Sequence, residues 1–190
     1  MKIYNFYKNL STFLMKTFYR IKVEGKENLP NEQGYLICAN HIHMFDPILI
    51  TVCSNHQVSH MAKKELFKIP ILGYIFKKCG SFPIDRGNID LNSIRTAVNI
   101  LKEKKVLSIF PEGTRHKDGK FRDIKNGAAY VAIQAKSNII PMRIIGNYKK
   151  PFSKLTLRIG KPISSTGCTM EELTEKLRIA IENLAPIPAV

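Results

Sequence analysis

The segment from Asn40 to Asp46 places an imidazole, His41, five positions before a carboxylate, Asp46. A short loop with this spacing can bring the two side chains into contact. The carboxylate would then accept a hydrogen bond from one ring nitrogen and leave the other free to take a proton from a hydroxyl group. Acyl transfer to an alcohol requires a general base of this kind. Because Asp46 precedes Pro47, a structural role as a helix N-cap is the alternative explanation.

A second imidazole in the same loop, His43, allows a different chemistry. Two imidazoles and a carboxylate are a common ligand set for zinc or non-haem iron, so His41, His43 and Asp46 predict, as an alternative, a metal-dependent hydrolase. Metallohydrolases of the His-x-His-x-Asp-His type have the aspartate two residues after the second histidine, whereas Asp46 comes three after His43. No further ligand motif follows, which favours a base that works without a metal.

A second polar cluster runs from Phe110 to Arg115 and turns at Gly113. Arg115 carries planar donors that can fork onto a phosphate, and a glycine lets backbone amides approach the same anion. Glu112 could hold the arginine or meet a substrate hydroxyl. A third segment ends in Arg86, which predicts that two arginines converge on one phosphomonoester. A solvated turn with a surface arginine is the alternative for the second cluster taken alone.

The elements that must position these clusters can be predicted from the hydrophobic pattern. Short apolar runs alternate with helical patterns, which predicts a single α/β domain with a mostly parallel central sheet flanked by helices. Predicted strands are Gly34 to Ala39, Gln57 to Ala62, Ser81 to Ile84, Val106 to Phe110, Ile139 to Ile145 and Leu155 to Ile159. Predicted helices are Pro47 to Cys53, Glu65 to Lys78, Leu91 to Lys104, Gly127 to Ala135 and Met170 to Leu184. The polar clusters follow strands, where open α/β sheets bind ligands.

The first 20 residues predict a separate amphipathic helix, with the functional domain over residues 21–190. The apolar positions of this helix are Ile3, Phe6, Tyr7, Leu10, Phe13, Leu14 and Phe18. Lys8, Lys16 and Arg20 interrupt them, so the segment is too polar in places to span a bilayer. A basic helix with aromatic side chains suits the membrane interface. A helix packed on its own domain has the same periodicity and is the alternative.

Composition narrows the class of partner without deciding it. The 190 residues include 30 Lys and Arg against 15 Asp and Glu, a formal net charge of +15. Such a surface attracts nucleic acid, an anionic membrane or a phosphorylated substrate, and a basic module without enzymatic activity that binds membrane or nucleic acid is an alternative function. The four cysteines are widely spaced and show no paired motif, which favours a reducing, cytosolic setting.

In order and spacing, these clusters resemble the glycerolipid acyltransferase family, whose best-known member is 1-acyl-glycerol-3-phosphate acyltransferase. The first family block, Asn-His-x4-Asp, is matched by Asn40, His41 and Asp46, and the second by Arg86. The third, Phe-Pro-Glu-Gly-Thr-Arg, is complete from Phe110 to Arg115. The fourth resembles Ile139-Ile140-Pro141, and His43 stands where the family commonly has Ser or Thr. The resemblance runs from about Val23 to Ile145.

The resemblance implies an acyltransferase domain that moves a fatty acyl group from acyl-CoA or acyl-carrier protein to the sn-2 hydroxyl of 1-acyl-glycerol-3-phosphate, giving phosphatidic acid in phospholipid biosynthesis. It casts His41 as the base and Asp46 as the carboxylate that orients it. The acceptor phosphate is then expected on Arg86, Glu112, Gly113, Thr114, Arg115 and Lys125, and the lipid-facing wall at Ile140 and Pro141. No metal or cofactor and no nucleic acid is expected, and the enzyme would sit peripherally on the cytoplasmic face of an anionic membrane.

Overall fold

Seven strands form one sheet in a computed structural model that describes residues 2–85, 90–116 and 121–186. The strands are β1 (Arg20–Glu24), β2 (Leu36–Ala39), β3 (Val58–Lys63), β4 (Phe82–Ile84), β5 (Val106–Ile109), β6 (Ile139–Gly146) and β7 (Lys154–Ile159). Their order across the sheet is β1-β7-β6-β2-β5-β3-β4. The five strands from β6 to β4 are parallel, whereas β7 is antiparallel to β6 and pairs in parallel with β1. The predicted, mostly parallel sheet is confirmed.

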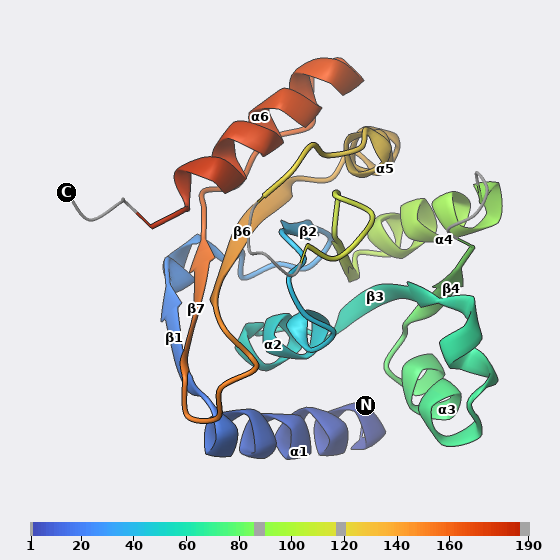
Figure 1. Ribbon diagram of the computed structural model, residues 1–190. Helices are drawn as coiled ribbons and strands as arrows, with labels where there is room; N and C mark the ends of the chain where they lie inside the picture. The colour runs from blue at the N-terminus through green and yellow to red at the C-terminus, as the bar shows by residue number, and fades with distance from the viewer. Residues whose placement is uncertain (1, 86–89, 117–120, 187–190) are drawn as a thin grey trace.

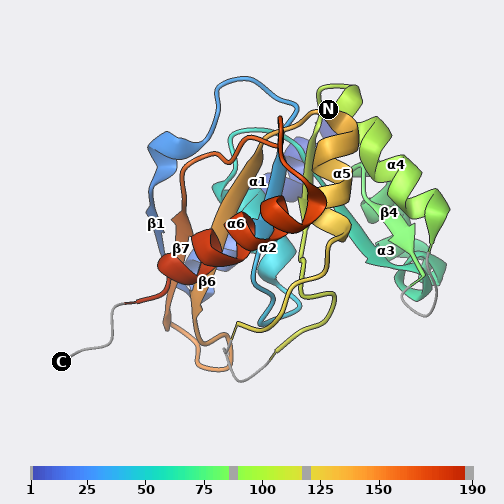
Figure 2. The same cartoon turned by 90° about the horizontal axis from the view of Figure 1, so that it is seen from above.

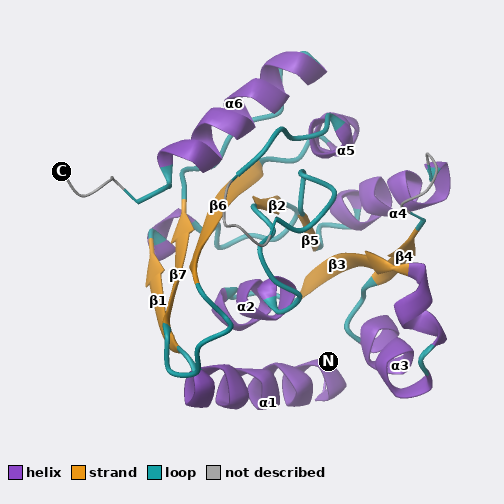
Figure 3. Ribbon diagram, in the orientation of Figure 1, coloured by secondary structure: helices purple, strands orange, loops and turns teal. Residues whose placement is uncertain are grey.

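Helices cover both faces of the sheet (Figure 3). They are α1 (Lys2–Phe18), α2 (Asp46–Cys53), α3 (Pro70–Lys78), α4 (Leu91–Lys102), α5 (Gly127–Ala135) and α6 (Met170–Asn183), with short 3₁₀ helices η1 (Lys26–Asn28) and η2 (Lys64–Lys68). In Figure 1, α1 and α2 lie below the sheet, and α5 and α6 lie above it. Figure 2, seen from above, has α6 nearest to the viewer and α1 behind.

Two apolar cores result, one on each side of the sheet, because successive side chains of a strand point to opposite faces. In β2, Ile37 and Ala39 belong to the core under α1 and α2, whereas Leu36 and Cys38 belong to the core under α4, α5 and α6. All four of these side chains are fully buried. The central strands are therefore held from both sides, and the loops at their ends start from fixed positions.

Most predicted elements are found within two residues of their predicted bounds, and the helix from Gly127 to Ala135 has the predicted ends. One strand was missed, and one predicted helix needs correction. Strand β1 was not predicted, since it is a short edge strand whose pairing partner is β7. The single helix predicted over Glu65 to Lys78 is wrong: it is divided into η2 and α3, because Ile69 precedes Pro70 and adopts an extended backbone.

Helix α1 packs on the domain with its more polar side. Tyr4 and Met15 are its buried residues, and the Lys8 ammonium donates a hydrogen bond of 2.7 Å to the Ser54 carbonyl. The opposite side carries exposed apolar residues: Ile3, Phe6, Leu10, Phe13, Leu14 and Phe18. The periodicity was compatible with either orientation, and the structure turns the apolar side away from the sheet. No helix in residues 2–85, 90–116 or 121–186 is long and apolar enough to cross a membrane.

Candidate active site

The sheet topology brings the predicted clusters to one edge. Strands β2 and β5 are parallel neighbours, with Leu36 opposite Leu107 and Cys38 opposite Ile109. Their carboxyl ends therefore point the same way, and the loop that carries His41 lies beside the loop that starts at Phe110. β3 and β4 end at the same edge, next to β5. This edge is where open α/β sheets bind ligands, as the sequence predicted.

His41 and Asp46 are in contact. The Nδ1 atom of His41 lies 2.7 Å from Oδ2 of Asp46, and the two residues are 5% and 0% exposed. The same carboxylate oxygen accepts hydrogen bonds of 2.7 Å from the backbone N–H groups of Ile42 and His43. Because a carboxylate can only accept, Nδ1 carries the proton in the neutral ring and Nε2 keeps its lone pair. The pair has the arrangement that a general base requires.

Asp46 does not act as the predicted N-cap. Helix α2 already begins at Asp46, its N-cap is Phe45, and that cap makes no side-chain hydrogen bond. The Asp46 carboxylate instead reaches back to the amides of the preceding loop, at Ile42 and His43. An N-cap side chain would accept from amides further along the helix. The side chain thus serves the loop that holds His41.

Phe110 and Glu112, from the loop after β5, hold His41 in place. The Phe110 ring stacks on the imidazole with 4.1 Å between ring centroids and an interplanar angle of 17°. Oε1 of Glu112 accepts a 2.8 Å hydrogen bond from the His41 backbone N–H. In return, the His116 N–H donates to the His41 carbonyl over 2.8 Å. The ring and the backbone of the predicted base are therefore both fixed by the neighbouring loop.

Glu112 is directed at the protein, and no phosphate contact is needed to account for its position. Its Oε2 accepts from the Arg122 backbone N–H over 3.3 Å and lies 3.6 Å from Nε2 of His116. The residue is 5% exposed, and burial raises the pKa of its carboxyl, opposed by the backbone hydrogen bonds from His41 and Arg122. Its predicted place in the phosphate site stays a prediction, whereas its contacts make it a residue that positions His41.

The other predicted phosphate ligands of this loop are exposed. Gly113 has a φ of 73°, which favours glycine, and a Cβ there would lie 3.3 Å from Cε of Lys125. The Lys125 N–H donates to the Pro111 carbonyl over 2.9 Å, so the lysine is anchored to the same loop. Thr114 and Arg115 follow at the surface. Neither Arg115 nor Lys125 has an ion-pair partner among the residues whose positions are described, so both cations are available to an anion.

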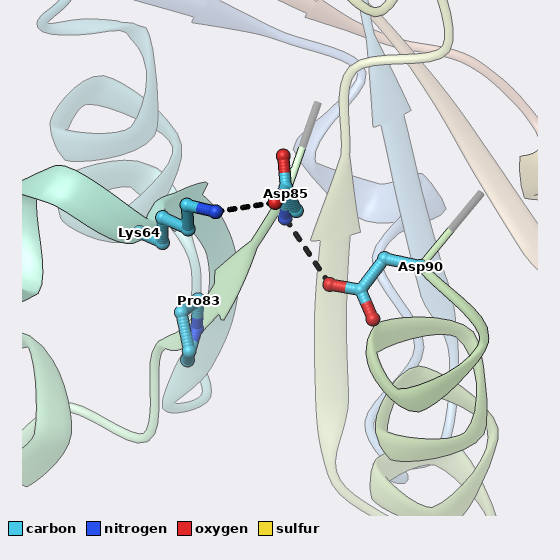
Figure 4. A pocket seen from close by; sticks show the side chains of 4 residues that line it. All are labelled: Lys64, Pro83, Asp85 and Asp90. Carbon is cyan, nitrogen blue, oxygen red and sulfur yellow. Dashed lines mark hydrogen bonds and ion pairs between the residues drawn. The ribbon is translucent and has the colours of Figure 1, made fainter. Parts of the chain in front are cut away.

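Arg86, the remaining predicted phosphate ligand, lies outside the described residues. The segment just before it ends at a cavity of about 390 Å³ lined by Lys64, Pro83, Asp85 and Asp90 (Figure 4). The Lys64 ammonium forms an ion pair with Asp85, whose N–H donates to Asp90 over 3.1 Å. The cavity lies where β3 and β4 end, at the same edge of the sheet as His41.

Ile140 and Pro141, the predicted lipid wall, lie inside the sheet. Both are buried in β6, where Ile140 is opposite Ile37 and Pro141 opposite Cys38 of β2. The Pro141 carbonyl accepts a hydrogen bond of 2.8 Å from the Gly160 N–H. Neither side chain offers exposed surface to a ligand in this conformation. Their contact with lipid stays a prediction.

The alternative metal site is not assembled. The His43 ring stacks on Tyr148, with 4.5 Å between centroids, and its Nδ1 accepts from the Phe45 N–H over 3.3 Å. The Asp46 carboxylate is hydrogen-bonded to the His41 ring. Within the described ranges, no group of three or more His, Cys, Asp or Glu side chains is placed to hold a metal ion. The geometry favours the base over the metal-dependent hydrolase.

Two further residues of the site were not singled out from the sequence. Asn40, quoted only as part of a motif, accepts from the Ile144 N–H over 2.7 Å and donates to its carbonyl over 3.0 Å, so it fastens the end of β2 to β6. Tyr148 follows β6, more than 100 positions from His43, and packs against it. An asparagine before the histidine could have suggested the first contact. Nothing in the local pattern points to Tyr148.

Comparison with known proteins places these features in a wider group. The family model described as Acyltransferase matches residues 20–145. A 1-acyl-sn-glycerol-3-phosphate acyltransferase of Bacillus subtilis (strain 168) is 33% identical over 187 residues, covering 96% of this chain and 93% of the relative. One of Streptococcus pneumoniae is 37% identical over 123 residues, covering 63% of this chain but only 45% of the relative.

A solved structure has the same fold. The crystal structure of the 1-acyl-sn-glycerophosphate (LPA) acyltransferase PlsC from Thermotoga maritima superposes with a TM-score of 0.79 and 27% sequence identity. The match covers 96% of this chain and 77% of that one. The similarity therefore extends beyond the motif loops to the sheet and to the helices around it.

Proposed function

Since this chain belongs to the acyltransferase family, we propose that it transfers a fatty acyl group from an acyl thioester to the sn-2 hydroxyl of 1-acyl-glycerol-3-phosphate, yielding phosphatidic acid. The observation that carries the proposal is the buried pair of His41 and Asp46, with Nε2 of the imidazole left to act as the base. The printed names of the relatives from Bacillus subtilis and Streptococcus pneumoniae support the choice of acceptor.

The proposed reaction needs one base and no covalent enzyme intermediate. Nε2 of His41 takes the proton of the acceptor hydroxyl as its oxygen attacks the thioester carbonyl carbon. The tetrahedral intermediate collapses, the carbon–sulfur bond breaks, and the imidazolium returns the proton to the leaving thiolate. Asp46 stabilises the imidazolium while it exists and keeps the ring in its reactive tautomer. No metal or cofactor takes part in this scheme.

The acceptor phosphate is proposed to bind at the exposed loop beside the base. Arg115 and Lys125 supply two cations, and the Lys125 side chain lies beside Gly113, which has no side chain of its own to hinder a phosphate there. The family resemblance adds Arg86 and Thr114. Phosphate held here would place the glycerol hydroxyl toward the neighbouring loop, where His41 lies. The cations thus bind and orient the substrate, while the buried pair performs the proton transfer.

The donor is proposed to be acyl-CoA or acyl-carrier protein. Both are acidic, and a net charge of +15 attracts either of them, so charge does not discriminate between the two. The same charge would attract nucleic acid, but the proposed acyl transfer does not involve nucleic acid.

Peripheral membrane binding through α1 is the last part of the proposal. The outward apolar residues of the helix, Ile3, Phe6, Leu10, Phe13, Leu14 and Phe18, are between 38% and 68% exposed. A helix that turns its polar side to its own domain gains little from apolar packing there, and an interface of lipid headgroups and acyl chains would cover the other side. The lipid substrate would then be met on the cytoplasmic face, where the donor is found.

The decisive experiment is an acceptor-dependent thiol-release assay. Purified protein is given acyl-CoA or acyl-carrier protein, each with 1-acyl-glycerol-3-phosphate, with glycerol 3-phosphate, or with neither. We expect thiol release and phosphatidic acid, identified by mass spectrometry, only with the first acceptor. Release that does not depend on any acceptor would indicate a thioesterase and would refute the proposal. Full activity with a chelator present is also expected.

A further inference from the structure

Tyr148 is held tightly beside the catalytic loop. Its ring stacks on His43 with an interplanar angle of 13°, and it meets the edges of Tyr19 and Phe45 at centroid distances of 5.5 and 6.4 Å. The Tyr19 hydroxyl donates to the Tyr148 carbonyl over 3.0 Å, which also fixes the backbone. Packing of the ring accounts for an aromatic residue at this position. It does not account for the hydroxyl group, since phenylalanine would stack as well.

The Tyr148 hydroxyl is a buried donor without an acceptor among the described residues, and Oδ1 of Asp46 is a buried acceptor without a donor. Tyr148 and Asp46 both contact His43. The Tyr148 ring stacks on the His43 imidazole, and the Asp46 carboxylate accepts a hydrogen bond from the His43 backbone N–H. Burial raises the pKa of the phenol, and the nearby Asp46 charge raises it further. The phenol therefore keeps its proton and remains a donor.

We propose that Tyr148 is a positioning residue of the acyl transfer, whose hydroxyl donates a hydrogen bond to Oδ1 of Asp46 and so fixes the carboxylate that orients His41. The inference rests on the proposed function. Oδ2 already has three donors, from the His41 ring and the amides of Ile42 and His43. A hydrogen bond to Oδ1 would keep the carboxylate from rotating about the Cβ–Cγ bond of Asp46 while His41 gains and loses its proton. In this proposal Tyr148 acts through Asp46 and not directly on the substrate.

The test variant is Tyr148→Phe, which keeps the stacked ring and removes only the oxygen. We expect kcat to fall by about tenfold while KM for both substrates stays within about twofold, because the lost bond acts on the base and not on binding. The matched control is Tyr35→Phe, which removes a buried hydroxyl from a tyrosine that packs on His56, at the opposite end of β2 from His41. Its kcat is expected to stay within about twofold of wild type.

A second readout is independent of turnover. The proton between Nδ1 of His41 and Asp46 should give a low-field NMR resonance that disappears in His41→Ala. We expect Tyr148→Phe to shift this resonance and Tyr35→Phe to leave it in place. An unshifted resonance together with wild-type kcat in Tyr148→Phe would overturn the inference. So would an equal loss in both variants, or a Tyr148→Phe protein that no longer folds, since either would give the residue a structural role only.

The failure of this inference can be told apart from failure of the proposed function. If the wild-type protein forms no phosphatidic acid, the proposed function is wrong. If the wild-type protein is active and Tyr148→Phe matches it in kcat and in the His41 resonance, only the role of Tyr148 is wrong.

Discussion

His41, Asp46 and Glu112 are buried, whereas Thr114, Arg115 and Lys125, at the same edge of the sheet, are exposed. The buried group is held by backbone and side-chain hydrogen bonds, among them those from Ile42 and His43 to Asp46 and from His41 to Glu112. The exposed cations have no ion-pair partners in the part of the chain that the structure describes. A proton-transfer group works best when it is fixed and shielded from water, whereas an unpaired cation is tolerated only where water can solvate it. On the proposed function, this edge has two halves: a buried half, which would transfer the proton, and an exposed half, which would bind the anion.

The largest effect on kcat should come from removing the imidazole of His41, in the buried half of the site. His41→Ala removes the proposed base, so kcat is expected to fall by ~10² to 10⁴ in the thiol-release assay while KM for the acceptor changes little. His56→Ala serves as the matched control, because that histidine contacts Tyr35 and lies outside the site. Turnover above about a tenth of wild type in His41→Ala would remove the imidazole from the mechanism.

A smaller effect on kcat is expected from Glu112, which joins its loop to the loop of His41 by a hydrogen bond. Glu112→Gln keeps an oxygen for the His41 N–H but loses the charge, so kcat should fall by about tenfold. Burial raises the Glu112 pKa above its ordinary 4.5, so this carboxyl favours folding while protonated and loses that contribution as pH rises through the folded pKa.

That pH dependence gives the Glu112 prediction a control of its own. The free energy of unfolding of Glu112→Gln, relative to wild type, should increase as the pH is raised from 4 toward neutrality. Denaturant titrations at several pH values measure it. A relative stability that is flat over this range would contradict the raised pKa.

Substitutions in the exposed half should change KM for the acceptor. Arg115→Ala and Lys125→Ala each remove a proposed charge-assisted contact to the acceptor phosphate, which should raise KM for 1-acyl-glycerol-3-phosphate about tenfold and leave kcat nearly unchanged. Lys102→Ala, at the end of α4, is the control for loss of one surface charge. A fall in kcat with KM unchanged would mean that these cations act in the chemical step. The division between the two halves would then be wrong.

The smallest effect on chemistry is expected from α1, which belongs to neither half. Phe6→Ser with Phe13→Ser should reduce the fraction of protein bound to anionic vesicles and leave turnover of a short-chain, water-soluble substrate pair unchanged. Ile179→Ser on α6 changes an exposed apolar residue on the other side of the sheet (Figure 1) and should not affect vesicle binding. Equal losses in both variants would mean that α1 is not an anchor.

The positions of the loop with His41 and the loop with Glu112 could be predicted from the sequence because strand, loop and motif coincide there. His41 and Asp46 are close in the chain, and parallel pairing of β2 with β5 brings Glu112 to them. The orientation of Glu112 was not predictable, since nothing in the pattern indicates that its partner is a backbone amide of another loop. Tyr148 was missed for the same reason, because its contacts depend on how the turn after β6 folds back.

Periodicity also left open which side of α1 faces the protein. Tyr4 and Lys8 make specific contacts with His56 and Ser54, and such polar contacts decided the orientation against the apolar stripe. The helix from 65 to 78 was predicted as continuous because its apolar spacing is helical on both sides of Pro70. The effect of the proline on Ile69 outweighed that spacing.

The pairing of β1 with β7 has a consequence for the order in which the molecule can form during synthesis. β1 is made before the other strands of the sheet but lies at its edge, and its partner β7 is made only after more than 120 further residues. Closing such a long loop is slow compared with local helix formation. Helix α1 would therefore be present, with its apolar residues uncovered, well before the sheet is complete, and a nascent chain would have the opportunity to settle on a bilayer first and finish its sheet there.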